Sequence, residues 1–470
     1  MNPNQPRIDL DRVIALCRKA LKDNPDNATA HHDLGVALME KRDFTNALTH
    51  LERAAELAPK HVLTHYLLGI ARAEKMALDE AIESWKRMLE LDRRNSKKLN
   101  GMAHYFIGKV YGLKGMWDAA LMEFNRAKKY MANNPLLLSA EAEIHLAKGE
   151  LEEAKRQWLA TAKLTPDDPR AALNVCAIAL DTADYRLALE YGQRVLALGQ
   201  DNAAVRFNLG LAHLRLGDYD AAIQQLETAV RLDAADVSAR LNLGEAYVRK
   251  GLIDEGVRQW EEVASDQPNS PEPLYNIGLA YAQSGLSQRA LEYWQKGLER
   301  DPDYLPIYMA RAANYAERDQ FSESMADWQK VLELDPESTI ARINLMIIHI
   351  RQGDYQAALD VPQTEDQEQP DLRFLQALCR LKLGEEEAAL KELAQVLEVD
   401  PEVSGRYVAL VQSCLDPAEL ADLETEHQAA LQALSDLLEA DPEAEPPSPA
   451  APPAAEEKGL WASLLKALRR

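Results

Sequence analysis

The sequence lacks the long apolar runs and the paired cysteines that mark several classes of protein. No run reaches the roughly 18 apolar residues that a membrane-spanning helix needs, and the N-terminus has no apolar core of a signal peptide. The four cysteines are far apart and show no metal-ligand spacing: Cys17, Cys176, Cys379 and Cys414. We therefore expect free, buried thiols in a reducing compartment and a cytoplasmic protein.

Basic charge is also scarce. The chain of 470 residues has 53 Lys and Arg against 76 Asp and Glu, a formal charge of −23. Binding of DNA or RNA requires a basic face that displaces counterions, so the composition excludes nucleic acid as a partner. The acidic balance favours solubility and a basic partner.

Motifs for catalysis are missing as well. The sequence has no Gly-rich phosphate loop, no GxSxG and no HExxH. His61 and His65 stand four residues apart, as metal ligands on a helix do, but they have no obvious third ligand. We interpret them as surface histidines near a helix start, and we expect neither enzymatic activity nor a metal or cofactor.

The strongest pattern present is a repeat of 34 residues between Val237 and Ser338. Leu243-Gly244 and Ile277-Gly278 mark one helix of successive copies. The second helix is marked by Trp260, Trp294 and Trp328, and the copies close with Pro268, Pro302 and Pro336. A fixed period of this length predicts a stacked array of helix pairs.

The repeat extends in both directions. Aligned units begin near Ala28, Val62, Gly101, Pro135, Pro169, Ala203, Val237, Pro271, Leu305, Thr339 and Pro370. A small residue recurs in the first helix, as Gly35, Gly69, Gly108, Ala142, Cys176, Gly210, Gly244, Gly278 and Ala312. A second small position follows twelve residues later, as Ala47, Ala81, Ala120, Ala154, Ala188, Ala222 and Ala290. Because glycine in mid-helix costs about 1 kcal/mol relative to alanine, its recurrence indicates close helix packing.

These positions resemble the tetratricopeptide repeat over roughly Ala28 to Val403, which implies an all-α superhelical solenoid of about eleven repeats. The chain departs from the family at one position of the first helix. The family has tryptophan there, and this chain has His31, His65, His104, Arg206, Arg240 and Arg342. Tryptophan stands instead in the second helix, as Trp85, Trp158, Trp260, Trp294 and Trp328, where we expect core packing.

The resemblance and the composition predict five segments. Residues 1–27 form an N-terminal capping helix, and residues 28–403 form the array. Residues 404–440 form capping helices, residues 441–457 a Pro/Ala-rich disordered linker, and residues 458–470 a basic amphipathic tail. The array is irregular at 96–100, where five residues are inserted, and at 362–369, where a second helix is cut short. Either irregularity is a hinge or partner contact, or a plain loop, and we favour the loop.

An asparagine ladder is the best candidate site. Consecutive units carry Asn174, Asn208, Asn242 and Asn276 at one position, and Asn344 continues the series after Ala310. This position points away from the buried face of its helix at 100° per residue. The ladder resembles the arrays of O-linked N-acetylglucosamine transferases, whose amides grip the backbone of an extended peptide, although no transferase domain follows. The alternative is that each asparagine bonds a neighbouring helix.

Other side chains accompany the ladder. An arginine follows three of the ladder asparagines at a distance of seven residues, on the same face of the helix. These arginines favour an acidic ligand: Arg215, Arg249 and Arg351. Aromatic residues occupy a position next to the ladder, where we expect them to contact apolar side chains of the bound peptide. They are Tyr66, Tyr105, Phe207 and Tyr275. The predicted partner is thus an extended protein segment in the groove of the array.

The tail has one apolar stripe, formed by Trp461, Leu464, Leu465 and Leu468. Such a helix is marginal alone and needs a surface, which is an anionic membrane, a partner groove or the chain's own array; the remaining alternative is an idle tail. We therefore expect a non-catalytic scaffold or adaptor, cytoplasmic and peripheral at a membrane if the tail binds there weakly. The alternatives are a self-associating assembly protein and a membrane-recruited organiser.

Overall fold

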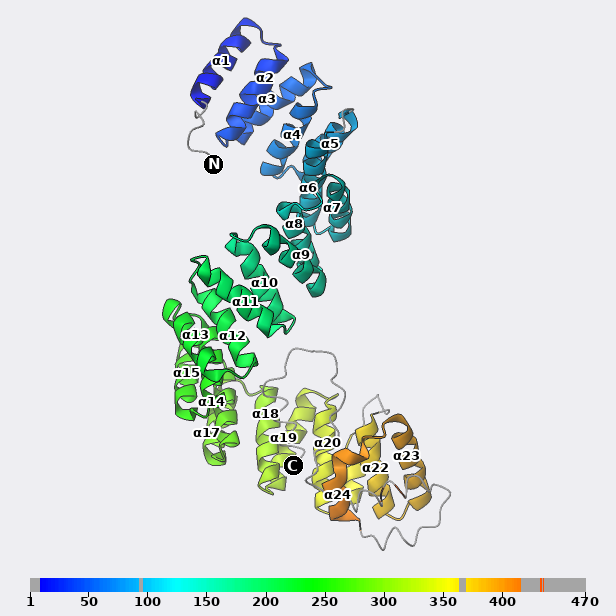
Figure 1. Cartoon of the computed structure of the whole chain (residues 1–470). Coiled ribbons are helices and arrows are strands. Elements are labelled where there is room, and N and C mark those ends of the chain that lie inside the picture. The colour runs from blue at the N-terminus through cyan, green and yellow to red at the C-terminus, as the bar shows by residue number, and fades with distance from the viewer. Residues whose placement is uncertain (1–8, 93–95, 363–368, 416–431, 433, 435–470) are drawn as a thin grey trace. The chain divides into compact units, whose positions relative to one another are not determined.

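The computed structural model describes residues 9–92, 96–362, 369–415, 432 and 434 (Figure 1). These residues form 24 α-helices and one 3-10 helix, and no strand occurs among them. The all-α fold expected from the repeat is therefore confirmed. The chain divides into two compact units, Met1–Ala239 and Arg240–Arg470.

The first unit contains thirteen helices among its described residues. They are α1 (Leu10–Asp23), α2 (Ala28–Glu40), α3 (Phe44–Leu57), α4 (Val62–Glu74), α5 (Leu78–Leu91), α6 (Lys97–Leu113), α7 (Trp117–Met131), α8 (Pro135–Ala147), α9 (Leu151–Leu164), α10 (Pro169–Asp181), α11 (Tyr185–Ala197), α12 (Ala203–Arg215) and α13 (Tyr219–Leu232). From α2 onward, each even-numbered helix packs against the next as the first and second helix of one repeat.

The second unit continues the same alternation. Helix α14 (Val237–Arg249) spans the division between the units. The others are α15 (Ile253–Asp266), α16 (Glu272–Gln283), α17 (Ser287–Arg300), α18 (Leu305–Glu317), α19 (Phe321–Leu334), α20 (Thr339–Arg351), α21 (Tyr355–Leu359), α22 (Pro370–Lys382), α23 (Glu386–Val399), η1 (Ser404–Tyr407) and α24 (Val408–Cys414).

Local sequence explains where these helices begin and end. The side chains of Asn27 and Asp218 accept hydrogen bonds from the backbone amides of Ala30 and Ala221, which caps α2 and α13. Proline at the first position starts other helices, such as α8. The turn after α12 contains Gly217 at φ +80°, a left-handed conformation that glycine adopts without strain.

The glycines of the first helices have the packing role expected from the sequence. A Cβ built on Gly35, Gly108 or Gly210 would lie 2.5–2.6 Å from a side-chain carbon of the second helix, namely Leu51, Phe124 or Leu226. The second small position is also buried, because Ala47, Ala81, Ala120, Ala154, Ala188, Ala222 and Ala290 have no exposed surface. Small residues therefore set the close approach within each repeat.

The core is a series of clusters, each shared between one repeat and the next. One cluster joins Trp85 of α5 to Ile107 of α6, and another joins Trp158 of α9 to Val175 of α10. All five second-helix tryptophans are buried, as expected: Trp85, Trp158, Trp260, Trp294 and Trp328. Because each cluster needs the neighbouring repeat to close it, the stability of the array is shared between adjacent repeats.

The insertion before the third repeat is not a loop. Residues 97–100 are helical and extend the start of α6, which has 17 residues where the first helices of neighbouring repeats have 13. Their addition lengthens α6 by about one turn, because a turn takes 3.6 residues. The loop interpretation of this irregularity is therefore wrong for these residues. At the other irregularity, α21 contains only five residues.

Further helices lie at the two ends of the described chain. Helix α1 packs on α2, with Ile14 and Cys17 buried against Leu34. Near the other end, α24 contacts α20, and the Tyr407 ring stacks on Phe374 with 5.5 Å between the ring centroids. The linker at 441–457, the tail at 458–470 and its stripe residues lie outside the described residues, as do residues 416–431, 433 and 435–440 of the capping helices expected at 404–440.

Candidate functional site

The face that carries the ladder is formed by first helices. In the first unit α2 contacts α4, α4 contacts α6, α6 contacts α8 and α10 contacts α12. In the second unit α16 contacts α18 and α20 contacts α22. The first helices of successive repeats thus touch each other directly. Within each unit, side chains at one register position of contacting first helices therefore lie on neighbouring helices.

All five asparagines of the ladder are half-buried. The Nδ2 of Asn174 donates to the carbonyl of Arg170 at 2.9 Å, and the Nδ2 of Asn344 donates to the carbonyl of Ile340 at 2.8 Å. Each of these bonds stays within one helix and fixes the amide on it. One N–H and the amide oxygen are left over for a ligand.

Asn208 differs from these two, because its amide bonds a neighbouring repeat. Burial raises the pKa of the Cys176 thiol to about 11, and a hydrogen bond from Asn208 opposes part of that rise. Cys176 lies on α10 and Asn208 on α12. At this position the ladder makes the kind of interhelical bond that the structural interpretation of the sequence expected.

Asn276 is the position where the amide is least engaged. It is half-buried on α16, and its side chain makes no hydrogen bond to another described residue. The gap in the ladder, Ala310, is 2% exposed. Neither polar atom of the Asn276 amide is buried, so its donors and its acceptor all remain available to a ligand.

The three arginines that follow the ladder are all exposed. Arg249 lies 3.6 Å from Glu245 on the same helix, an ion pair that offsets part of its charge. Arg351 forms no ion pair with a described residue and ends α20. Arg215 occupies the corresponding position at the end of α12.

The prediction for the aromatic residues is wrong in two of the four cases. Tyr105 is 8% exposed and Tyr275 is 9% exposed, and both belong to core clusters. Burial raises the pKa of both hydroxyls, most strongly at Tyr275. Only Tyr66 and Phe207 keep half-buried rings that a ligand could contact. The packing of adjacent helices covers the other two.

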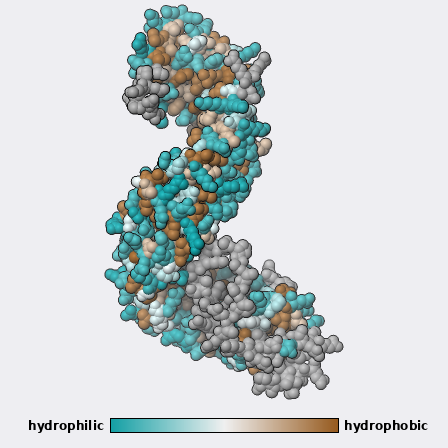
Figure 2. Space-filling view, in the orientation of Figure 1, coloured by the Kyte–Doolittle hydropathy of each residue, from teal (hydrophilic) through white to brown (hydrophobic). Residues whose placement is uncertain are grey.

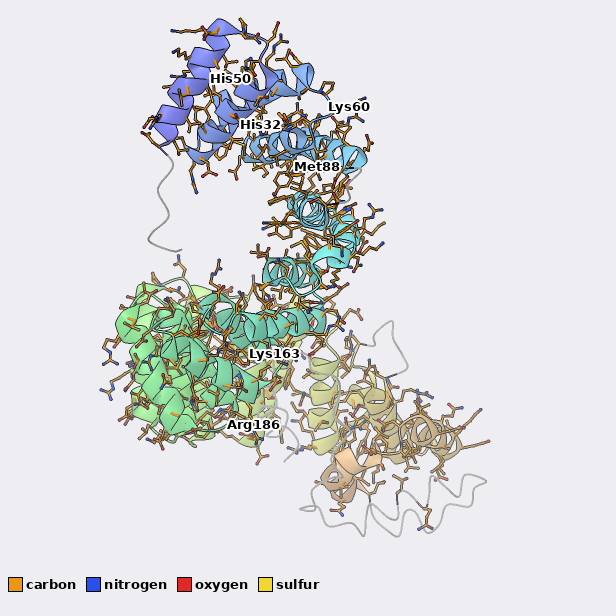
Figure 3. All side chains as sticks on the ribbon, turned by 45° about the horizontal axis from the view of Figure 1, so that its top comes forward. His32, His50, Lys60, Met88, Lys163 and Arg186 are labelled. Carbon is orange, nitrogen blue, oxygen red and sulfur yellow. The ribbon has the colours of Figure 1, made fainter. Side chains whose placement is uncertain are left out.

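The histidines of the first two repeats are engaged in internal bonds. Figure 3 places His32 and His50 among the N-terminal helices. Nδ1 of His32 and Nδ1 of His61 lie 2.9 and 2.6 Å from the Thr64 hydroxyl. No group of three or more His, Cys, Asp or Glu residues within the described ranges has the geometry of a metal site.

One recurring contact was not found from the sequence. The residue at the family's tryptophan position donates to the carbonyl of a proline six residues earlier, in the preceding turn. His31 donates to Pro25 at 3.0 Å and His65 to Pro59 at 2.9 Å. The same bond occurs at Tyr308–Pro302, and again at Arg342–Pro336. The alignment of these positions with the closing prolines was the available signal.

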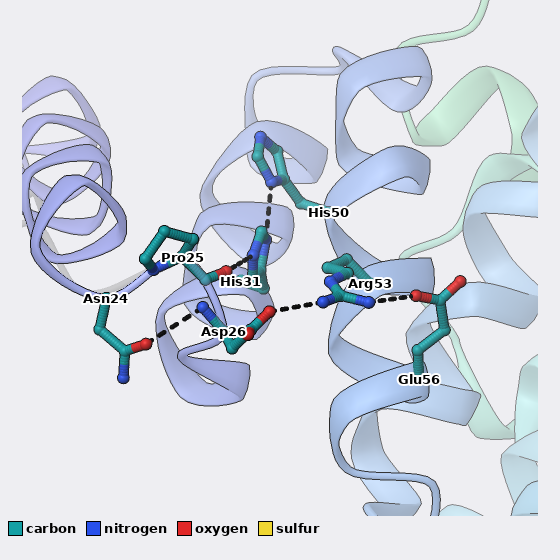
Figure 4. A network of polar contacts seen from close by, with 7 residues as sticks. All are labelled: Asn24, Pro25, Asp26, His31, His50, Arg53 and Glu56. Carbon is teal, nitrogen blue, oxygen red and sulfur yellow. Dashed lines mark hydrogen bonds and ion pairs between the residues drawn. The ribbon is translucent and has the colours of Figure 1, made fainter.

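Figure 4 shows this contact in the first repeat. The carbonyl of Pro25 accepts only, so Nε2 of His31 carries the proton of that bond. In a neutral ring Nδ1 then accepts, and His50 Nδ1 donates to it at 3.0 Å. Beside it, Arg53 bridges Asp26 and Glu56. The network joins the turn after α1 to α2 and α3.

Two charged residues in the packed face of first helices were also missed, the buried Glu141 and the half-buried Arg311. Glu141 and Arg311 stand at a position that is leucine or isoleucine in most of the other repeats. The Arg311 guanidinium binds both oxygens of the buried Asp327 at 2.7 Å, and Lys128 binds Glu141 at 2.8 Å. Buried charges require such partners. The Lys128–Glu141 pair joins α7 to α8, and the Arg311–Asp327 pair joins α18 to α19.

Among the described helices, none has the length and apolar character required to cross a membrane. On the face shown in Figure 2, hydrophilic residues alternate with apolar ones on the described surface. The tail residues proposed for surface contact lie outside the described residues.

Comparison with known proteins places these features in a family. A family model for the tetratricopeptide repeat matches residues 14–61, 32–96, 177–237, 207–272 and 241–304. A curated relative, the E3 ubiquitin-protein ligase CHIP of Arabidopsis thaliana, is 41% identical over 51 residues. That match spans 11% of this chain and only 18% of the relative's length.

Solved structures of similar architecture include YrrB, described as a TPR protein with an unusual peptide-binding site. It is 23% identical, covers 39% of this chain and 95% of its own, and has a TM-score of 0.35. The APC/C hetero-tetramer Cut9-Hcn1 has a chain that is 12% identical, covers 91% of this chain and 92% of its own, and has a TM-score of 0.34. With its helix pairs, its period and its matching family model, the chain belongs to the tetratricopeptide repeat family and is a protein-interaction scaffold.

Proposed function

We propose that the array is a non-catalytic adaptor that binds an extended peptide segment of a partner protein along its asparagine ladder. Each ladder amide offers a donor and an acceptor, which is the pattern that a peptide unit presents in return. In this proposal the helices at residues 1–27 and 404–440 cap the array at its ends.

The half-buried, unbonded amide of Asn276 carries the proposal. Asn174 and Asn344 support it, because their one bond each runs to their own helix and holds the amide in place. An amide that is held in place loses less conformational entropy when it binds a ligand. Arg351 adds a cation at the same face, which favours acidic residues in the bound segment.

The ladder asparagines differ in their internal hydrogen bonds, so their substitutions should have different effects, and this difference provides the test. A peptide selected against the full-length protein from a randomised display library serves as the probe. Asn276→Ala is expected to weaken its binding about fivefold to tenfold, the effect of about 1–1.5 kcal/mol for one hydrogen-bonding group. The melting temperature should change little, since no internal bond is lost.

Asn208→Ala is the matched control. It removes the bond to Cys176, so it should lower the melting temperature as well as any affinity. A selected peptide whose affinity is unchanged by Asn276→Ala and by Asn344→Ala contradicts the proposal. Self-association is the competing function, and light scattering of the free protein at several concentrations separates it from a monomeric adaptor.

A further inference from the structure

The third repeat differs in charge from the rest of the chain. Residues 97–134 contain seven Lys or Arg residues and two acidic residues, a net charge of +5 in a chain of −23. Two of the lysines, Lys97 and Lys98, belong to the additional turn of α6. The insertion that is peculiar to this repeat therefore also supplies part of its basic charge.

Most of these cations have a carboxylate partner. Arg126 pairs with Glu123 at 2.5 Å, Lys128 pairs with Glu141 at 2.8 Å, and Lys114 pairs with Asp79. Lys109 lies 4.0 Å from Glu143. Four of the seven cations thus have a carboxylate partner, one within the repeat and three in the adjacent repeats.

The remaining three lysines do not share this pairing. Lys97, Lys98 and Lys129 are exposed and form no ion pair with a described residue. In a chain with 76 acidic residues, unpaired cations in one repeat are a feature that internal stability does not explain.

The three lysines lie at one edge of the repeat, where α6 begins and α7 ends. A Cβ on Gly101 would lie 3.0 Å from Cβ of Tyr130 and 3.1 Å from Sδ of Met131, so these two helix ends are in contact. Lys98 lies one turn before Gly101, and Lys129 is next to Tyr130. Nearby in sequence, the first turn of α8 carries Leu136, which is 53% exposed.

We propose that this basic edge, formed by Lys97, Lys98 and Lys129, binds an acidic segment of a partner protein, with the exposed Leu136 at the start of the next helix as an apolar contact. The unpaired cations attract carboxylates, and the exposed leucine side chain contacts an apolar residue within the segment. The surface is separate from the asparagine ladder, and its occupancy does not depend on the ladder's function.

The size of the edge and the charge of the chain favour a short peptide over a larger polyanion. Charges in water are screened beyond roughly 8 Å at physiological salt. A short acidic segment therefore experiences mainly the local cations. A nucleic acid or an anionic membrane extends over the acidic remainder of the chain and is repelled by it.

The test measures fluorescence anisotropy of the full-length protein with a labelled peptide of about ten residues, in which glutamates flank a central leucine. The expected result is binding that weakens as salt rises. The triple variant Lys97→Glu, Lys98→Glu, Lys129→Glu should reduce the affinity about tenfold or more, because three weak ion pairs are lost together.

The control variant changes the net charge equally at scattered, exposed lysines that also lack ion pairs in the described structure: Lys19→Glu, Lys60→Glu, Lys163→Glu. Figure 3 labels Lys60 and Lys163. It should change the affinity less than about twofold, since these side chains lie in other repeats. The milder triple Lys→Gln variant at 97, 98 and 129 excludes an effect of misfolding.

Three results would overturn the proposal. Equal weakening of peptide binding by both triple variants would show that binding depends on net charge and not on the basic edge. If the wild-type protein did not bind the peptide, the basic edge would not be a binding surface for acidic segments. Binding of an RNA oligomer or of phosphatidylserine vesicles that depends on the three lysines, without peptide binding, would show that the partner class is wrong. Asn276→Ala should leave the affinity for this peptide unchanged, which separates this test from that of the ladder.

Discussion

At the scale of single residues, one contact recurs between a glycine of the first helix and a tryptophan of the second. In the repeats with Gly69, Gly244 and Gly278, the indole nitrogen lies where a Cβ would stand, 2.2–2.3 Å from its ideal position. The indole N–H then reaches a backbone carbonyl of the first helix, as Trp294 reaches Tyr275 at 3.2 Å. The same bond occurs in the other two repeats, from Trp85 to Tyr66 and from Trp260 to Leu241.

Two repeats have alanine at the glycine position, and there the bond is absent. Nε1 of Trp158 and Nε1 of Trp328 are buried without a hydrogen-bond partner in the described structure. Their repeats carry Ala142 and Ala312. The alanine methyl accounts for the difference, because it occupies the space that the indole nitrogen uses in the other repeats.

This contact predicts that Gly278→Ala destabilises the second unit although alanine favours helix. The new Cβ displaces the Trp294 ring and breaks its hydrogen bond, at a cost of about 2–3 kcal/mol for overpacking and an unsatisfied donor. The gain in helix propensity of about 1 kcal/mol offsets only part of this. Hydrogen exchange of the α16 and α17 amides is the measurement, since local stability differs along an array. Gly405→Ala, where nothing lies within 4 Å, is the control and should be nearly neutral.

The tryptophans themselves give a second prediction. Trp294→Phe removes the hydrogen bond from the indole N–H to the Tyr275 carbonyl, whereas Trp158→Phe removes an indole N–H that makes no hydrogen bond. The first substitution should therefore destabilise its repeat by about 1 kcal/mol more than the second. Thermal unfolding of the two variants compares them, and equal losses would contradict the role given to the bond.

At the scale of helices, the repeat period predicted where most first helices begin. It did not predict how far adjacent helices bury their side chains. The expected starts at Ala28 and Pro135 coincide with α2 and α8. The start expected at Gly101 is off by one turn, because the inserted residues continue the helix. The burial of Tyr105 and Tyr275 was not predictable, since register gives the direction of a side chain but not the depth to which the next helix covers it.

The network around His50 predicts acid sensitivity of the first repeat. Burial, with His31 and Arg18 nearby, lowers the pKa of His50 below its usual 6.5. The unfolded chain therefore binds a proton that the folded chain does not, and stability falls as pH drops through 6.5 until the folded pKa is reached. Hydrogen exchange of α2 and α3 at pH 7.5 and 5.5 should show this loss.

His50→Asn is the comparison for this prediction. It keeps a donor near Nδ1 of His31 and cannot titrate. The variant should lose less stability than the wild type between the two pH values, while protonation of carboxylates affects both proteins alike. An identical loss in both proteins would show that His50 does not contribute.

At the scale of the whole molecule, we propose two independent binding surfaces on one scaffold. The ladder was predictable from the sequence because its residues share the repeat period, but Asn208 and Asn276 differ in a way that only their packing reveals. The basic edge was not predicted, since its identification required knowing which lysines are paired. The two surfaces lie in different repeats, and each repeat contacts only its neighbours, so substitutions in the basic edge should leave Asn276 unaffected.

The most direct test of the central claim compares two forms of the peptide selected on the ladder. One form has its backbone amides methylated at alternate residues, and the other has its side chains truncated to alanine. The account predicts that methylation weakens binding about tenfold or more, because the ladder amides bond the peptide backbone, while truncation has a smaller effect. Binding that survives methylation and is abolished by truncation would contradict recognition of the backbone by the asparagine ladder.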